Sequence, residues 1–143
     1  MSKEIVVLEL ADPGQWPEAA HASRPHLLLL CWNADRASSA NIYSLAERAL
    51  AQGAVYVCSW GVDCERVHDV FDEAIVGDGS GPIERLNVTT TWHEDESLEE
   101  VVEYALSSAR LGTEAGALPI VAATIADAGV AMRLRVALKA AQA

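Results

Sequence analysis

The sequence predicts an α/β fold, a three-layer αβα sandwich built on a mainly parallel sheet of four to five strands. The first observation behind this prediction is an alternation along the chain: short runs rich in Val, Leu, Ile or Thr are followed by segments with apolar residues at helical spacing. The second is the run 26–32, which is apolar on both faces, as expected for a central strand covered by helices on both sides. The third is the length of 143 residues, which is typical of one domain, so we expect residues 1–143 to form a single domain.

Five runs have the length and composition of β-strands, and turn residues such as Pro13 and Gly14 bound them. They cover residues 4–10, 26–32, 54–60, 87–92 and 118–125. The last run carries Pro119 near its start. Because proline lacks the N–H that a central strand donates, we expect this strand at an edge of the sheet.

The segments between these runs have the apolar spacing of amphipathic helices. They are a short segment at 16–23 and longer segments at 40–52, 67–75, 98–106 and 130–141. The clearest start signal is Ser97, which is followed three residues later by Glu100 in the pattern of a capping box. Strands and helices that alternate in this way imply right-handed crossovers, so the predicted fold is flavodoxin- or Rossmann-like.

Acidic residues outnumber basic ones by 21 to 10, which gives a formal net charge of −11. A surface of this sign repels polyanions, so no nucleic acid is expected as a partner. The last 18 residues contain three basic residues and one acidic residue and carry +2, which leaves −13 for the rest of the chain. This basic segment is expected to dock on the chain's own acidic surface or on a second copy. A homodimer through the C-terminal helix is predicted, because Met132 and Val136 lie outside that helix's main apolar stripe.

No membrane segment or secretion signal is predicted. No stretch approaches the roughly 20 apolar residues that a membrane helix needs, and Glu9 interrupts the apolar run near the N-terminus. We therefore expect a cytoplasmic location, no membrane partner, and reduced core thiols at Cys31, Cys58 and Cys64. The G-x-G-x-x-G motif, the P-loop and the G-x-S-x-G nucleophile elbow are absent, and no cofactor is predicted.

Three predicted strands end on a tryptophan, namely Trp32, Trp60 and Trp92. Since parallel strands end at the same edge of a sheet, where ligands bind in open α/β folds, we expect the three indoles at one rim. Flat rings supply stacking area and polar neighbours fix orientation, so the predicted ligand-binding residues are these tryptophans with Asn33 and Asp35. The alternative is that the tryptophans only cap the sheet against its helices.

His93 follows the fourth predicted strand, and imidazole is well suited to acid–base chemistry near neutral pH. Glu94 beside it, or Asp63 after the third strand, would supply the carboxylate that orients the ring. The predicted catalytic residues are therefore His93, Glu94 and Asp63, acting on a small substrate. The alternative is a solvated histidine in the loop before a helix.

The chain also contains the residue types of a Cys2His2 zinc site, in Cys58, Cys64, His68 and His93. These residues lack the C-x-x-C pair of closed zinc motifs, and Cys64 falls on the apolar stripe of its helix. No metal site is therefore predicted.

Two segments, 60–69 (WGVDCERVHD) and 90–98 (TTWHEDESL), look like a small bacterial family of uncharacterised proteins, a domain of unknown function. This resemblance covers the middle third of the chain and implies no activity. Ser59 and Trp60 followed by Glu65 are similar to the Ser-x-Trp-Cys-x-x-Glu pattern of nucleotide-hydrolysing Toll/interleukin-receptor-type domains, but the spacing differs and no role passes to Glu65. The sequence thus predicts a binding, interaction or regulatory module with a small-ligand site at the carboxyl ends of the strands. The alternative is a small enzyme that uses His93 and a carboxylate on a nucleotide-like or other small substrate.

Overall fold

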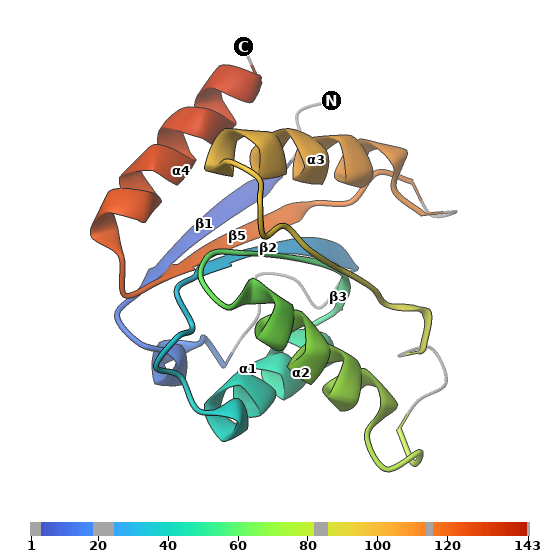
Figure 1. The fold of residues 1–143 in the computed structure, drawn as a ribbon. Helices are drawn as coiled ribbons and strands as arrows, with labels where there is room; N and C mark the ends of the chain where they lie inside the picture. The colour runs from blue at the N-terminus through green and yellow to red at the C-terminus, as the bar shows by residue number, and fades with distance from the viewer. Residues whose placement is uncertain (1–3, 19–24, 82–85, 114–115, 143) are drawn as a thin grey trace.

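The computed structural model describes residues 4–18, 25–81, 86–113 and 116–142. Five strands form one sheet in the order β1-β5-β2-β3-β4 (Figure 1). They are β1 (Ile5–Leu10), β2 (His26–Trp32), β3 (Ala54–Trp60), β4 (Thr89–Trp92) and β5 (Ile120–Ile125). All the pairings between them are parallel, which confirms the predicted sheet.

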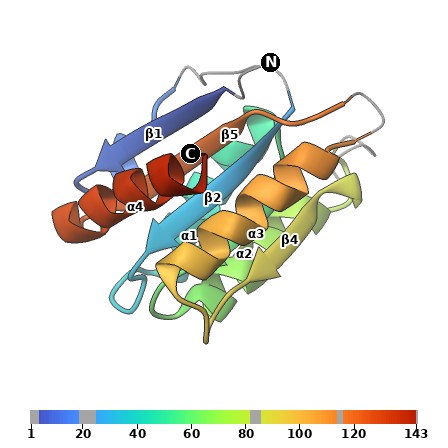
Figure 2. The same cartoon turned by 90° about the horizontal axis from the view of Figure 1, so that it is seen from above.

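Helices cover both faces of this sheet, which confirms the predicted αβα sandwich (Figures 1 and 2). One face is covered by α1 (Ser39–Ala51) and α2 (Cys64–Val76), and the other by α3 (Leu98–Leu111) and α4 (Ala128–Ala141). The capping box is present at the start of α3. Ser97 Oγ accepts from the Glu100 N–H at 3.1 Å, and the Glu100 carboxylate accepts from the Ser97 N–H at 2.8 Å.

Strand β2 lies at the centre of the core, because it has a neighbouring strand on each side and a helical layer on each face. Leu28 and Leu30 pack toward α1 and α2, whereas Leu27 and Leu29 pack toward α3 and α4. All four leucines are buried, and burying each such side chain stabilises the fold by about 1.5–3 kcal/mol. Alternation along a strand with two covered faces thus explains why this run is apolar throughout.

The prediction that the last strand lies at an edge is wrong, because β5 lies between β1 and β2. Pro119 precedes Ile120, the first residue of the strand, and the Pro119 carbonyl accepts from the Leu27 N–H at 2.9 Å. The N–H that proline lacks therefore falls outside the strand, whose own residues keep their donors. The edges of the sheet are instead β1 and the short β4.

A single turn, the 3-10 helix η1 (Pro13–Gln15), precedes the stretch 16–23 that was expected to form a short helix. Residues 16–18 follow it without helical structure, and residues 19–24 lie outside the described residues. Trp16 is buried against α1, and its Nε1–H donates to Gln52 Oε1 at 3.0 Å. Trp16 therefore contributes one buried ring to the core rather than the first turn of an amphipathic helix.

The direction of the chain across the sheet reverses once. From β2 to β4 successive strands are neighbours, and the helices that join them lie on the α1–α2 face. After β4 the chain returns through α3, on the other face, to β5 (Figure 2). The adjacent strands β2 and β5 therefore send the chain to opposite faces at their carboxyl ends. Such a switch point is where ligands bind in open α/β sheets.

Candidate functional site

A cavity of about 140 Å³ lies at this switch point. Its wall is formed by the ends of β2 and β3, the residues that follow them, and the start of α4. The lining residues are Cys31, Trp32, Asn33, Trp60, Gly61, Val62, Asp127 and Val130. We call this space the switch-point cavity. It brings together three of the five predicted ligand-binding residues, Trp32, Asn33 and Trp60.

The two indoles of the switch-point cavity come from opposite faces of the sheet. Trp32 is buried and packs in the core under α1 and α2, whereas Trp60 is half-buried on the side of α3 and α4. The Trp60 Nε1–H donates to the Glu96 carbonyl at 2.8 Å, which fixes the orientation of the ring. The cavity wall is therefore already ordered, and a ligand that binds there orders few side chains.

Gly61 allows the ends of β2 and β3 to approach each other closely. Its φ is +120°, which side chains disfavour, and a Cβ at this position would lie 2.4 Å from the Trp32 carbonyl oxygen. The segments that follow β2 and β3 are also hydrogen-bonded to each other, because the Val62 carbonyl accepts from the Ala34 N–H at 3.0 Å. The shape of the cavity wall therefore depends on glycine at position 61.

Polar side chains complete the lining of the switch-point cavity. Asp127 is the N-cap of α4, and its carboxylate accepts from the Val130 N–H at 3.0 Å. Asn33 is exposed, and its Oδ1 accepts from the Asp35 N–H at 3.2 Å, so Asp35 supports the loop beside the cavity. A carboxylate in a protein of net charge −11 favours uncharged or cationic ligands over anions.

Arg66, which was not predicted as a functional residue, joins the two loops next to this cavity. Its guanidinium donates to the carbonyls of Ala34 at 2.6 Å and Ala37 at 2.8 Å, and it pairs with the Asp63 carboxylate at 2.7 Å. Asp63 itself is the N-cap of α2, with a left-handed φ of +66° that aspartate tolerates. The structure thus places the predicted catalytic Asp63 in a loop clamp. In the sequence, this ion pair could have been predicted because an acidic and a basic residue three positions apart can meet on one side of a helix start.

The third tryptophan lies apart from the other two. Trp92 is opposite Ser59 in the pairing of β4 with β3, so it faces α2, whereas Trp60 faces α3. Its side chain is 43% exposed and stacks on the His68 ring, with centroids 4.5 Å apart. The structure therefore places Trp32 and Trp60 at the switch-point cavity, whereas Trp92, which shares the α1–α2 face with Trp32, lies on the edge strand outside it.

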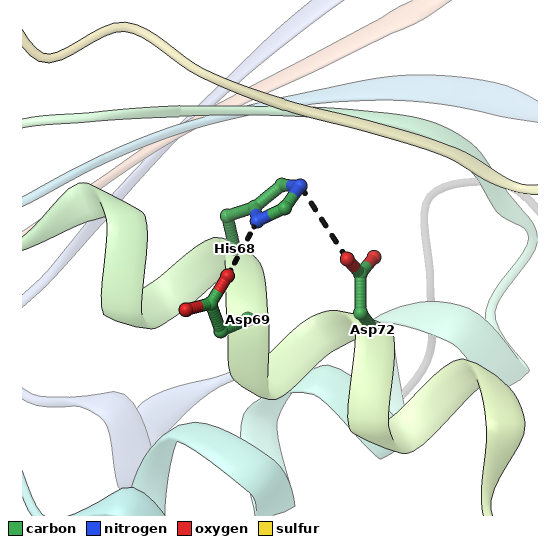
Figure 3. A group of neighbouring side chains, drawn as sticks. All are labelled: His68, Asp69 and Asp72. Atoms are coloured by element: carbon green, nitrogen blue, oxygen red, sulfur yellow. Dashed lines mark hydrogen bonds and ion pairs between the residues drawn. The ribbon is translucent and has the colours of Figure 1, made fainter.

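His68 lies between two carboxylates of its own helix (Figure 3). Its Nδ1 is 2.9 Å from Asp69 Oδ1, and its Nε2 is 3.5 Å from Asp72 Oδ2. Within the described part of the chain, these three residues form the group of side chains close enough together to hold a metal ion, and Cys58 and Cys64 lie outside it. The two carboxylates approach different ring nitrogens, however, so this arrangement is a set of polar contacts around the imidazole rather than a set of ligands that converge on one ion.

The three cysteines are buried free thiols, which confirms that prediction. Burial raises the pKa of Cys31 and that of Cys58 to about 12, and burial also raises the pKa of Cys64. Thiols in this state stay protonated at neutral pH, and a protonated thiol is a poor nucleophile and a poor metal ligand. The cysteines therefore belong to the core.

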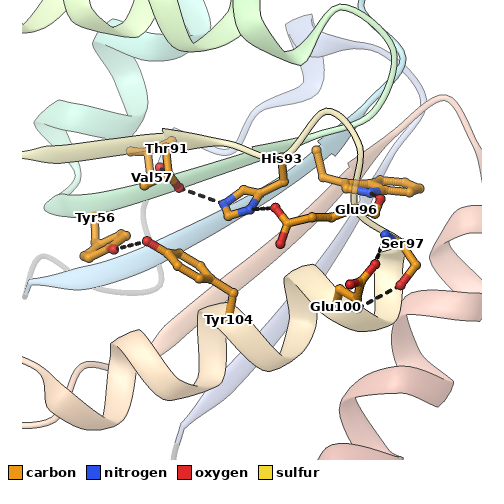
Figure 4. Close-up of polar contacts among 9 residues, drawn as sticks. Tyr56, Val57, Thr91, His93, Glu96, Ser97, Glu100 and Tyr104 are labelled. Carbon is orange, nitrogen blue, oxygen red and sulfur yellow. Dashed lines mark hydrogen bonds and ion pairs between the residues drawn. The ribbon is translucent and has the colours of Figure 1, made fainter.

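His93 forms a second candidate site just after β4 (Figure 4). Its Nε2 lies 2.9 Å from Thr91 Oγ1, and its Nδ1 is in close contact with the Glu96 carboxylate. The imidazole is 5% exposed and packs against the Tyr104 ring, with centroids 4.6 Å apart. An adjacent cavity of about 340 Å³, which we call the β4 cavity, is lined by Thr90, Thr91, Trp92, His93, Glu96 and Tyr104.

Glu96 occupies the position that was expected for Glu94 or Asp63. Glu94 is exposed, and Asp63 pairs with Arg66. The chain turns between His93 and the start of α3. This turn places the Glu96 side chain, three residues after His93, over the imidazole ring. Adjacent side chains at the end of a strand point to different sides, and this is why Glu94 and His93 diverge.

Tyr104 closes one side of the β4 cavity as a neutral phenol. Its hydroxyl forms a hydrogen bond with the Tyr56 hydroxyl at 2.6 Å (Figure 4). Burial, followed by this hydrogen bond, raises the pKa of Tyr104 to about 12. The side chain therefore offers a ring and a neutral O–H group to anything bound beside His93.

The fold and these two sites define a doubly wound α/β domain with a cavity at its switch point and a histidine–carboxylate pair on the neighbouring strand. The chain belongs to the family described as "Domain of unknown function (DUF7684)", whose model matches residues 5–141. The prediction of an uncharacterised domain family is thus confirmed, and the match extends well beyond the middle third of the chain. Neither a curated protein nor a solved structure gives a significant match. No helix in the described ranges is both long and apolar enough to cross a membrane.

Proposed function

We propose that this domain is a binding module whose ligand is a small, one-ring molecule held in the switch-point cavity. The observation that supports it is the placement of two indoles, Trp32 and Trp60, at the carboxyl ends of adjacent strands beside the point where the chain reverses. Loops that leave a sheet in opposite directions keep such a space open, and ligands of doubly wound domains are commonly found there.

The volume of the cavity limits the size of the ligand. An apolar protein cavity of about 150 Å³ accepts benzene, and the switch-point cavity measures about 140 Å³. One aromatic ring therefore matches the space, whereas a whole nucleotide is too large for it.

The lining also favours one sign of charge on the ligand. The Asp127 carboxylate accepts hydrogen bonds from N–H donors, and the face of an indole such as Trp60 attracts cations. The net charge of −11 adds to this preference. The proposed ligand class is therefore a single ring that carries an amidinium or ammonium group, or an uncharged ring with N–H donors.

Benzamidine and benzoate are suitable probes, because they share a ring and differ in the sign of their charge. Titration followed by tryptophan fluorescence should show saturable binding of benzamidine and roughly ten-fold weaker binding of benzoate, a difference of about 1.4 kcal/mol. Asp127→Asn keeps an N-cap residue but removes the charge, so it should abolish this preference. Asp12→Asn, at the N-cap of η1, is the matched control and should leave the preference unchanged. Equal binding of both probes, or no saturable signal with benzamidine, would contradict the proposal.

The homodimer through the C-terminal helix stays a prediction, and the surface of α4 supports it. Two arginines of α4 pair with acidic residues of the same chain: Arg133 with Glu99 at 3.9 Å and Arg135 with Glu9 at 3.6 Å. Both pairs are exposed contacts within one chain, so they are compatible with either expected location of the basic segment and do not bear on the dimer. Met132 and Val136 remain 70% and 64% exposed, and they lie four residues apart on one side of the helix. A second copy of α4 would cover this apolar pair.

A further inference from the structure

Thr91, His93 and Glu96 are held in place by backbone contacts that do not depend on a ligand. Thr91 and His93 are two residues apart on an extended chain, so both side chains project toward α3 (Figure 4). Glu96 lies in the loop before α3. Its carbonyl is bound by the Trp60 Nε1–H at 2.8 Å, and the next residue, Ser97, forms the capping box. The backbone positions of these three residues are therefore fixed before any ligand binds.

The contacts run in the order that activates a hydroxyl group. A carboxylate at Nδ1 holds the ring proton there, which leaves Nε2 as an acceptor for the Thr91 hydroxyl at 2.9 Å. The imidazole is 5% exposed, so water competes little for either ring nitrogen. A nucleophile next to a base, with a third group orienting that base, is the general pattern of covalent catalysis by hydroxyl groups.

A donor for a developing oxyanion lies next to Thr91. The His93 N–H donates to the Ser59 carbonyl of β3 at 3.0 Å. Since successive N–H groups of a strand point to opposite sides, the Trp92 N–H points away from β3, at the edge of the sheet. This N–H belongs to the residue that follows the nucleophile, and a backbone donor at such a place stabilises the charge of a tetrahedral intermediate.

From these contacts we propose that Thr91, His93 and Glu96 form a catalytic triad that hydrolyses small, uncharged carboxylic esters in the β4 cavity. Thr91 is the nucleophile, His93 the general base and acid, and Glu96 the group that orients His93. The cavity of about 340 Å³ accommodates a short acyl group beside the Tyr104 ring, which packs against His93. Acidic residues precede α3, so an uncharged ester is favoured over an anionic one.

The reaction consists of two balanced steps. In the first, Thr91 Oγ1 attacks the ester carbonyl carbon while His93 Nε2 takes the hydroxyl proton. His93 then gives this proton to the leaving alkoxide oxygen as the ester C–O bond breaks. In the second, His93 takes a proton from water, the resulting hydroxide attacks the acyl carbon, and the Thr91 oxygen leaves with that proton. The products are one alcohol and one carboxylic acid.

Cys58 lies opposite Thr91 in the strand pairing but does not compete with it as a nucleophile. It is fully buried, and burial raises its pKa to about 12, so the thiol stays protonated. Thr91 is half-buried and lines the β4 cavity. The accessible hydroxyl is therefore the attacking group.

4-Nitrophenyl acetate tests this proposal on the full chain. Wild type should release 4-nitrophenolate faster than buffer does, and peptide mass spectrometry should find an acetyl group on Thr91. Thr91→Val preserves the shape of the side chain and should lower the rate about 100-fold or more, with loss of the adduct, whereas Thr91→Ser should retain both. Glu96→Gln should slow the reaction without moving the adduct, because its role is to position His93.

His68→Gln is the matched control, because His68 is a second shielded histidine paired with carboxylates, on the opposite face of the sheet. It should leave the rate unchanged. A wild-type rate equal to that of buffer, a Thr91→Val variant as fast as wild type, or an adduct on another residue would overturn the proposal. If Thr91→Val does not fold, as judged by circular dichroism, the residue that carries the acetyl group in the wild type still tests whether Thr91 is the nucleophile. The benzamidine titration is a separate measurement, since it follows binding at the switch-point cavity and not ester hydrolysis.

Discussion

Replacing Gly61 by alanine should destabilise the fold and distort the switch-point cavity at the same time. The new Cβ would lie 2.4 Å from the Trp32 carbonyl oxygen and 2.9 Å from its carbon, so the ends of β2 and β3 must move apart. An alanine held at φ +120° costs about 1–3 kcal/mol, and relieving an overpacked contact costs about 1–3 kcal/mol more. We therefore expect a loss of about 4 kcal/mol. For 143 residues the entropy of unfolding is about 0.3 kcal/mol/K, so Tm should fall by roughly 13 °C.

Gly116→Ala separates the two parts of this cost. Gly116 has a similar φ of +111°, but a Cβ there would meet no described atom within 4 Å. This control should therefore lose only the backbone part, about 2 kcal/mol or roughly 7 °C. Thermal denaturation followed by circular dichroism measures both variants. If Gly61→Ala loses no more stability than Gly116→Ala, the close approach to Trp32 does not constrain the fold and the reasoning fails. Gly61→Ala should also weaken benzamidine binding, whereas Gly116→Ala should not.

Two further predictions concern the core thiols and the surface of α4. Because the pKa of Cys31 and of Cys58 is raised from 9.0 to about 12, the unfolded chain loses these protons first, so the stabilisation is present below pH 9 and is lost as the pH rises toward 12. The free energy of unfolding, measured by urea denaturation, should fall by about 1.4 kcal/mol per thiol between about pH 8 and about pH 10, and a Cys58→Ala variant that showed the same pH dependence as wild type would refute this assignment. At high micromolar concentration, sedimentation equilibrium should give a dimer for wild type and a monomer for Met132→Lys. A wild-type monomer under those conditions would remove the predicted homodimer.

The alternation of strands and helices could be predicted from the sequence, because each element carries its own local signal. The order of the strands could not, because it depends on contacts between residues far apart in the chain. Pro119 illustrates the difference: its missing N–H suggested an edge strand, but the strand begins one residue later and lies inside the sheet. Local chemistry thus indicated that a strand was present and misled about its neighbours.

The candidate site, too, could be predicted only in part from the sequence. Trp32 and Trp60 were expected together because they end neighbouring segments, and both line the switch-point cavity. Trp92 also ends a strand, but β4 pairs with β3 in a register that places it opposite Ser59 rather than Trp60. Trp92 therefore shares a face with Trp32, but β4 is the edge strand and lies farther from the switch point between β2 and β5, and no feature of the single sequence fixes this order of strands. The partner of His93 was missed for a related reason, since only the turn into α3 brings Glu96 over the ring.

Through the hydrogen bond between its Nε1–H and the Glu96 carbonyl, the Trp60 indole contacts both candidate sites. Its ring is a wall of the switch-point cavity, while its N–H anchors the loop whose side chain touches His93. An occupant that tilts the ring must stretch this bond of 2.8 Å, and the loop that carries Glu96 then has to follow. A ligand that tilted the ring in this way would link the two cavities, and by thermodynamic reciprocity each ligand would then change the affinity of the other by the same factor.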